Sequence, residues 1–178
     1  MKLYIDFDGV ILNTIEVSYK QIKEKYGDNA TTEESSKFYQ SINWESFIKE
    51  CSPINNSIEN LRKIMESNLY DVTILTHVLS DHEQVEKEKY LEEQLPGIKV
   101  IAVKKPSPKW DAVDCKDAIL VDDYSENLYD WEEHGGIAIK FTQKNKQYDF
   151  MTINSLETLL TEYKKIKQRT EKEKILKK

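Results

Sequence analysis

Short apolar runs and longer amphipathic stretches alternate along this chain. The apolar runs are bounded by glycine, proline or acidic residues, as is typical of buried strands, and they cover residues 3–5, 71–76, 98–103, 118–121 and 137–141. Between these runs, apolar residues recur at helical spacing. Strands that alternate with helices predict an α/β fold with a parallel, Rossmann-like sheet, right-handed crossovers and helices on both faces.

The longest interval between predicted strands follows the first one. It contains three short helical patterns, and Thr31 with Glu34 has the form of a capping box that opens the second of them. We expect residues 15–56 to form a small helical cap. The α/β core would then consist of residues 1–14 and 57–163.

The later helices have weaker signals. Val85 and Leu91 mark a long, charged helix after the second strand, and Ser125 is expected to cap the helix after the fourth. Beyond Lys164 the chain is rich in Lys, Glu and Gln. Residues 164–178 are therefore predicted to be a charged C-terminal helix end or tail.

Size and charge narrow the range of functions. The 178 residues are enough for one domain with a modest insertion. The net charge is −6 and the pI is near 5.2, which argues against a nucleic-acid polymer as partner because binding a phosphate backbone requires a basic face. A small phosphorylated molecule is compatible with this charge, since a few local cations and a metal hold it.

Targeting signals are not evident in the sequence. The first strand begins at once, no apolar run has the roughly 20 residues of a membrane span, and Cys51 and Cys115 lie far apart. We expect a cytoplasmic protein with reduced thiols and no membrane partner. The oligomeric state has no sequence signature.

Polar side chains follow three of the predicted strands. Asp6 and Asp8 come after the first strand, Thr76 ends the second, and Asp122 and Asp123 end the fourth. The carboxyl ends of parallel strands meet at one edge of a sheet, so these groups are expected to converge. Carboxylates at close range repel one another unless a cation compensates, and Mg²⁺ is the simplest candidate.

This ordered set resembles the motifs of the haloacid-dehalogenase-like hydrolase superfamily. Asp6-Phe7-Asp8-Gly9-Val10 is similar to its first motif, Thr76 to the second and Leu120-Val121-Asp122-Asp123 to the fourth. Lys109 matches the lysine of the third motif, with Lys104 and Lys105 as alternatives. Residues 122–128, followed by Trp131 and Gly135-Gly136, resemble the deoxyribonucleoside 5′-nucleotidase branch.

The resemblance implies a role for each residue. Asp6 would attack phosphorus, and Asp8 would act as general acid and base. Mg²⁺ would be held by Asp6, the backbone carbonyl of Asp8, and Asp123, with Asp122 as a further ligand or just behind the ion.

Other residues would bind phosphate or orient the first set. Thr76 and Lys109 would contact the phosphoryl oxygens, and Gly9 would let backbone N–H groups approach them. Asn127 would orient Asp123 or Lys109. His77, next to Thr76, would line the pocket or be a bystander.

The implied activity is a Mg²⁺-dependent phosphatase acting on a small phosphate monoester, such as a (deoxy)nucleoside 5′-monophosphate. A sugar-phosphate phosphatase, a phosphomutase and a non-catalytic metal- and phosphate-binding regulatory module are the alternatives. Asp8 argues against dehalogenation, because carbon–halogen-cleaving relatives lack this acid. Four aromatic residues of the predicted cap would either stack a nucleobase or pack its core: Phe38, Tyr39, Trp44 and Phe47.

Overall fold

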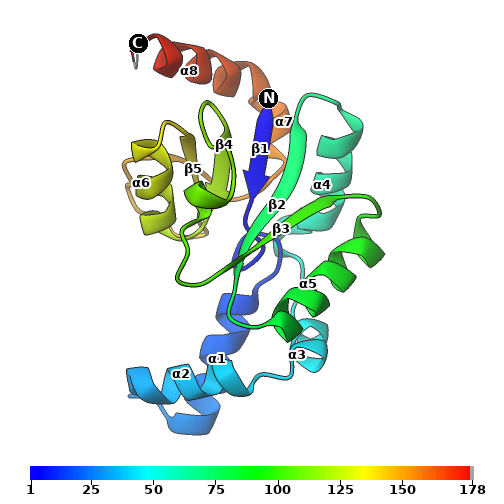
Figure 1. Ribbon diagram of the computed structural model, residues 1–178, viewed down its shortest axis with the longest axis vertical. Coiled ribbons are helices and arrows are strands. Elements are labelled where there is room, and N and C mark those ends of the chain that lie inside the picture. Colours follow the sequence, from blue (N-terminus) through cyan, green and yellow to red (C-terminus); the bar gives the residue numbers. More distant parts are fainter. Residues whose placement is uncertain (177–178) are drawn as a thin grey trace.

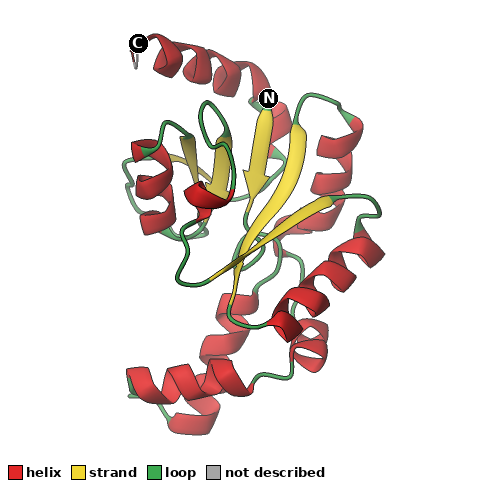
Figure 2. Ribbon diagram, in the orientation of Figure 1, coloured by secondary structure: helices red, strands yellow, loops and turns green. Residues whose placement is uncertain are grey.

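A parallel β-sheet forms the centre of the molecule. The computed structural model describes the backbone of residues 1–176 and the side chains of residues 1–171. Within this part the sheet has six strands in the order β3-β2-β1-β4-β5-β6 (Figures 1 and 2). Their bounds are β1 Lys2–Ile5, β2 Asp71–Val78, β3 Lys99–Lys104, β4 Ile119–Asp122, β5 Ile137–Phe141 and β6 Met151–Ile153. The predicted α/β, Rossmann-like class is confirmed.

Helices connect these strands. They are α1 Thr14–Tyr26, α2 Thr32–Ser41, α3 Trp44–Glu50, α4 Ser57–Glu66, α5 Asp81–Gln94, α6 Ser125–Glu133, α7 Thr158–Thr161 and α8 Tyr163–Leu176, with 3₁₀ turns η1 Ile54–Asn56 and η2 Lys109–Ala112. Helices α1, α2 and α3 lie beyond the end of the sheet toward which the β1 arrow points (Figure 1). That position supports the proposal that residues 15–56 act as a cap over the carboxyl ends of the strands.

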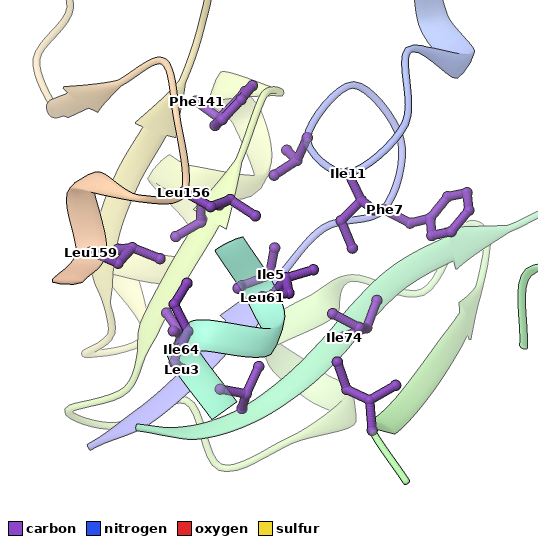
Figure 3. Close-up of a cluster of buried hydrophobic side chains, with 14 of the residues drawn as sticks. Leu3, Ile5, Phe7, Ile11, Leu61, Ile64, Ile74, Phe141, Leu156 and Leu159 are labelled. Atoms are coloured by element: carbon purple, nitrogen blue, oxygen red, sulfur yellow. The ribbon is translucent and has the colours of Figure 1, made fainter. Parts of the chain in front are cut away.

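One face of the sheet packs against α4, α5, α7 and α8. Leu3 and Ile5 of β1 lie against Leu61 and Ile64 of α4, and all four side chains are fully buried (Figure 3). Each such side chain contributes about 1.5–3 kcal/mol through removal from water. This cluster is the larger part of the core, and it holds β1 against α4.

The opposite face packs against α6. Tyr4 and Leu120 from the strands meet Leu128 and Trp131 from the helix. The indole N–H of Trp131 donates to the carbonyl of Ala118 at 2.9 Å, so this large side chain is buried with its polar atom satisfied. The molecule therefore has three layers, with helices on both faces of the sheet as predicted.

Several local predictions meet different outcomes. Thr31 and Glu34 form the expected capping box. The prediction that Ser125 caps α6 is wrong: Tyr124 precedes the helix, and the Ser125 hydroxyl accepts a hydrogen bond from Lys140 at 3.0 Å. Val85, expected to mark an inward face, is 54% exposed.

The chain beyond β5 contains more regular structure than its composition suggests. Strand β6 has only three residues and was not predicted. The segment expected as a helix end or tail continues in α8 as far as Leu176, with Ile166 and Thr170 buried, while residues 177–178 lie outside the described part.

Two further observations concern membrane-spanning helices and the oxidation state of the cysteines. Over the described residues, no helix is long and apolar enough to cross a membrane. Cys51 and Cys115 form no disulfide, as expected.

Candidate active site

The site lies where β1 and β4 end side by side. Ile5 pairs with Val121 in the parallel register, and the backbone N–H of Asp6 donates to the Val121 carbonyl at 2.9 Å. The next residue of each strand therefore lies at the same edge, which brings Asp6 beside Asp122. Connections leave these two neighbouring strands in opposite directions across the sheet, and such a position is where open α/β sheets bind ligands.

A tight loop follows β1 and requires glycine at one position. Gly9 has φ +69°, and its N–H donates to the Leu12 carbonyl at 2.9 Å. A Cβ on Gly9 would lie 2.8 Å from the Cγ of Asp123 and 3.2 Å from a carbon of Ile15. Gly9 thus allows the first loop and the end of β4 to approach each other.

Lys109 lies inside the carboxylate cluster. Its Nζ is 2.9 Å from Asp6 Oδ1 and 2.7 Å from Asp122 Oδ2, and its side chain is 1% exposed. Burial alone lowers the pKa of Lys109, but Asp122 and Asp6 outweigh this and raise it above its usual value, so the ammonium is retained. Lys104 instead pairs with the exposed Asp81, and Lys105 is exposed.

Asp122 holds Lys109 in place. Its Oδ1 accepts from the Tyr124 N–H at 2.8 Å, and its Oδ2 accepts from Lys109 and from the amide of Asn127, the latter at 2.9 Å. Asn127 was expected to contact Asp123 or Lys109. It reaches Lys109 only through their shared partner, Asp122.

Three acidic side chains form a cluster of suitable size for a metal. Oxygens of Asp6, Asp122 and Asp123 lie within 4.8 Å of one another. Burial, assisted by the neighbouring carboxylates, raises the pKa of Asp123 to about 8, and burial raises the pKa of Asp6 to about 7 against the opposing charge of Lys109. Carboxylates with such a deficit of positive charge fit a hard divalent cation such as Mg²⁺.

Asp8 is held on both of its oxygens. Its Oδ1 accepts from the Thr14 hydroxyl at 2.8 Å, and its Oδ2 lies 2.6 Å from Lys87 Nζ. The hydroxyl of Thr76, which is fully buried at the end of β2, is 3.4 Å from the same Oδ2. The structure therefore brings the expected hydroxyl and the second aspartate together.

Two lysines near the site were not anticipated from the sequence. Lys87 comes from α5, and Lys140 comes from β5, where it donates to the backbone carbonyl of Asp123. The available signal for Lys140 was a charged residue inside the apolar run of β5. Lys87 carried no such signal, because α5 is charged along most of its length.

The aromatic residues of the predicted cap differ in exposure. Phe38, Trp44 and Phe47 are buried and therefore pack within the molecule. Tyr39 is half-buried, and its hydroxyl shares a hydrogen bond with Ser18 at 3.0 Å. His77 turns its ring toward the carbonyl of Ser107, also at 3.0 Å, in the loop that leads to η2.

Most of the chain matches the model of one protein family. Residues 1–158 match the model described as "5′ nucleotidase, deoxy (Pyrimidine), cytosolic type C protein". The chain belongs to this 5′-nucleotidase family. The predicted relationship to haloacid-dehalogenase-like hydrolases and to their nucleotidase branch is thereby confirmed, and by family the protein is a phosphoric monoester hydrolase.

Solved structures of other hydrolases share the fold of this 5′-nucleotidase family member. A hydrolase from Pseudomonas syringae has a TM-score of 0.64 at 11% identity over 93% of this chain and 98% of its own. A HAD-superfamily hydrolase of subfamily IA from Geobacter sulfurreducens has a TM-score of 0.61 at 15% identity, over 90% of this chain and 98% of its own. A HAD phosphatase from Thermococcus onnurineus has a TM-score of 0.57 at 17% identity, over 93% of this chain and 97% of its own. No curated protein matches the sequence.

Proposed function

We propose that this protein is a Mg²⁺-dependent phosphatase that hydrolyses a nucleoside 5′-monophosphate through an aspartyl-phosphate on Asp6. The observation that carries the proposal is the buried contact of Lys109 with both Asp6 and Asp122, beside the free carboxylate of Asp123. This arrangement supports the proposal, because a carboxylate that could act as nucleophile lies against a fixed positive charge and beside a second carboxylate that could bind a metal.

Asp6 would be the nucleophile. Its Oδ1 accepts from the Phe7 N–H at 2.8 Å and from Lys109, whereas no hydrogen bond from the described residues reaches its Oδ2. Oδ2 would attack phosphorus, forming an O–P bond while the ester P–O bond breaks. Lys109 would stabilise the charge on the phosphoryl oxygens as the substrate arrives.

Asp8 would transfer the protons. In the first step it would give a proton to the leaving oxygen, and in the second it would take one from the water that attacks phosphorus in the aspartyl-phosphate. The second step releases phosphate and restores Asp6. The hydroxyl of Thr76 and backbone N–H groups near Gly9 would hold the phosphoryl oxygens meanwhile.

The residues that would hold Mg²⁺ are Asp6, Asp123 and the backbone carbonyl of Asp8. Among the described residues no hydrogen bond reaches the carboxylate of Asp123, whereas Asp122 has both oxygens engaged. Asp123 therefore suits a direct ligand and Asp122 an anchor for Lys109. The ion would supply positive charge that offsets the repulsion between the Asp6 carboxylate and the phosphate.

The substrate class is proposed from the family. The matching model is named for deoxy, pyrimidine 5′-nucleotides, so pyrimidine deoxynucleoside 5′-monophosphates are the first substrates to try. The negative net charge is compatible with a small anionic substrate in the cytoplasm, where a local cluster of lysines and a metal provide the attraction.

The test measures phosphate release with Mg²⁺ or with EDTA for the wild type and for Asp6→Asn. Asp71→Asn is the matched control, because Asp71 is exposed at the start of β2 and pairs with Lys99. We expect Asp6→Asn and EDTA to abolish turnover while Asp71→Asn retains it. Turnover by Asp6→Asn at the wild-type rate would refute the nucleophile, and full activity in EDTA would refute the metal.

A substrate panel then tests the branch. Pyrimidine and purine deoxynucleoside monophosphates are compared with hexose phosphates at equal concentration. The proposal expects a higher kcat/KM for the nucleotides. A preference for hexose phosphates would replace it with a sugar-phosphate phosphatase, and isomerised sugar phosphate as product would indicate a phosphomutase.

A further inference from the structure

A second lysine, Lys87, is buried beside the candidate active site. Its side chain is 1% exposed although it lies on α5, a helix that is charged along most of its length. Its Nζ lies 2.6 Å from Asp8 Oδ2, a residue 79 positions away in sequence. An ammonium withdrawn from water in this way is costly unless its partners compensate for the lost hydration.

The partners of Lys87 account for all three of its N–H groups. Besides Asp8, Nζ donates to Glu83 Oε1 at 2.7 Å and to the carbonyl of His77 at 3.1 Å. An ammonium has three donors and no acceptor. All the N–H donors of Lys87 are thus used within the protein, whereas a lysine that binds a substrate phosphate needs a donor that is available.

Rigid elements fix the lysine from behind. Glu83 accepts from the N–H of Leu79 at 2.8 Å through its other oxygen, so the pair is tied to the loop that precedes α5. The rings of Phe7 and Trp44 lie 5.3 and 5.1 Å from Nζ. The carboxylate of Glu83 and the two aromatic rings restrict the ammonium of Lys87 to one position. The ammonium can therefore act as a fixed donor to the carboxylate of Asp8.

We propose that Lys87 is a positioning residue for Asp8, an inference that rests on the proposed function. Lys87 holds Oδ2 as a hydrogen-bond acceptor, because an ammonium only donates. Oδ1 faces the hydroxyl of Thr14, which can donate or accept, and is therefore the oxygen that exchanges a proton with the substrate. Without Lys87 the carboxylate of Asp8 can rotate away from the leaving oxygen.

The test compares two leaving groups. p-Nitrophenolate departs without a proton, whereas the 5′-oxygen of a nucleoside needs one, so only the nucleotide depends on Asp8 in the first step. kcat/KM reports events up to loss of the leaving group and thereby isolates this step. Lys87→Met should lower kcat/KM for a pyrimidine nucleotide at least about tenfold more than for p-nitrophenyl phosphate, within the range that general acid catalysis supplies.

Three further variants define the result. Lys89→Met is the matched control, since Lys89 is an exposed lysine on the same helix, and it should leave both constants unchanged. Glu83→Gln keeps Lys87 but weakens its anchor, and it should shift the ratio in the same direction even if Lys87→Met fails to fold. In an Asp8→Asn background, Lys87→Met should not change the ratio further, because its effect acts through Asp8.

The outcomes separate this inference from the proposed function. If the wild type shows no Asp6-dependent hydrolysis of either ester, both are refuted. If it is active, but folded Lys87→Met or Glu83→Gln lowers kcat/KM for both esters by the same factor, Lys87 has only a structural role and this inference alone falls. A selective loss with the nucleotide, absent in the Asp8→Asn background, supports it.

Discussion

Replacing Gly9 with alanine tests the close approach between the first loop and the end of β4. The substitution acts in two separate ways. It places an L residue at φ +69°, which costs about 1–2 kcal/mol. It also places a Cβ 2.8 Å from the Cγ of Asp123, whereas ordinary carbon–carbon contacts are about 3.5–4.0 Å, so the carboxylate must move by about 0.7 Å or more.

The two effects have different consequences. Backbone strain should lower the melting temperature by about 2–8 °C in a protein of this size. Displacement of Asp123 should weaken Mg²⁺ binding, because Mg²⁺ requires near-ideal distances to its ligands. We expect a loss of about 10–100-fold in Mg²⁺ affinity, the size seen when groups around a metal are disturbed.

Gly97→Ala is the matched control. Gly97 has φ +80°, and a Cβ there meets nothing within 4 Å. Both variants should therefore melt at lower temperature in EDTA, while only Gly9→Ala should lose Mg²⁺ affinity in a calorimetric titration. If the two variants bind Mg²⁺ equally well, Asp123 is not held against Gly9 in the way that the proposed metal site requires.

Three other predictions concern the site and the core that supports it. Asn127→Ala removes a donor to Asp122 and should lower kcat about 10–100-fold with little change in melting temperature, as steady-state kinetics and a thermal scan would check. Without metal, the pKa values of Asp6 and Asp123 are raised in the folded protein, so these two groups lose their protons at lower pH in the unfolded chain than in the folded one. The free energy of unfolding should therefore fall as the pH rises from 3.8, the ordinary pKa of an aspartate, towards about 8. Mg²⁺ should accordingly raise the melting temperature more at about pH 8 than at about pH 5 in a thermal scan. Leu61→Ala should cost about 2–5 kcal/mol in urea unfolding because the side chain is fully buried between α4 and β1, and a loss under about 1 kcal/mol would contradict that packing.

The sequence predicts the sheet better than the surfaces of its helices. The five longer strands are apolar runs bounded by turn residues, and all five are present. Strand β6 escapes prediction because three residues show no period. On α5 the hydrophobic pattern is right for Leu91, which is fully buried, and wrong for Val85, which is exposed. Glu83 and Lys87 share the buried face with Leu91, because Lys87 lies between the carboxylates of Glu83 and Asp8.

The acids of the site were predictable for a topological reason. Asp6 comes directly after β1 and Asp8 two residues later, while Asp122 ends β4 and Asp123 follows it. Parallel strands bring such positions to one edge whatever their separation in sequence. The lysines reach that edge from a 3₁₀ turn, a helix and the middle of a strand. The resemblance pointed to Lys109, but no rule of spacing relates the other two places to the site, so only the folded structure shows that Lys87 meets Asp8 and that Lys140 meets the carbonyl of Asp123.

The distribution of those lysines is itself an argument about the metal. Lys109 contacts Asp6 and Asp122, and Lys87 contacts Asp8. Lys140 donates to the backbone carbonyl of Asp123, and its charge partly offsets the raised pKa of that carboxyl group, but among the described residues no ammonium lies within 4.0 Å of the Asp123 carboxylate. Asp6 and Asp122 therefore share one ammonium and Asp8 has another, whereas the Asp123 carboxylate has none in direct contact among the described residues. A divalent ion placed between Asp123 and Asp6 would supply the missing positive charge.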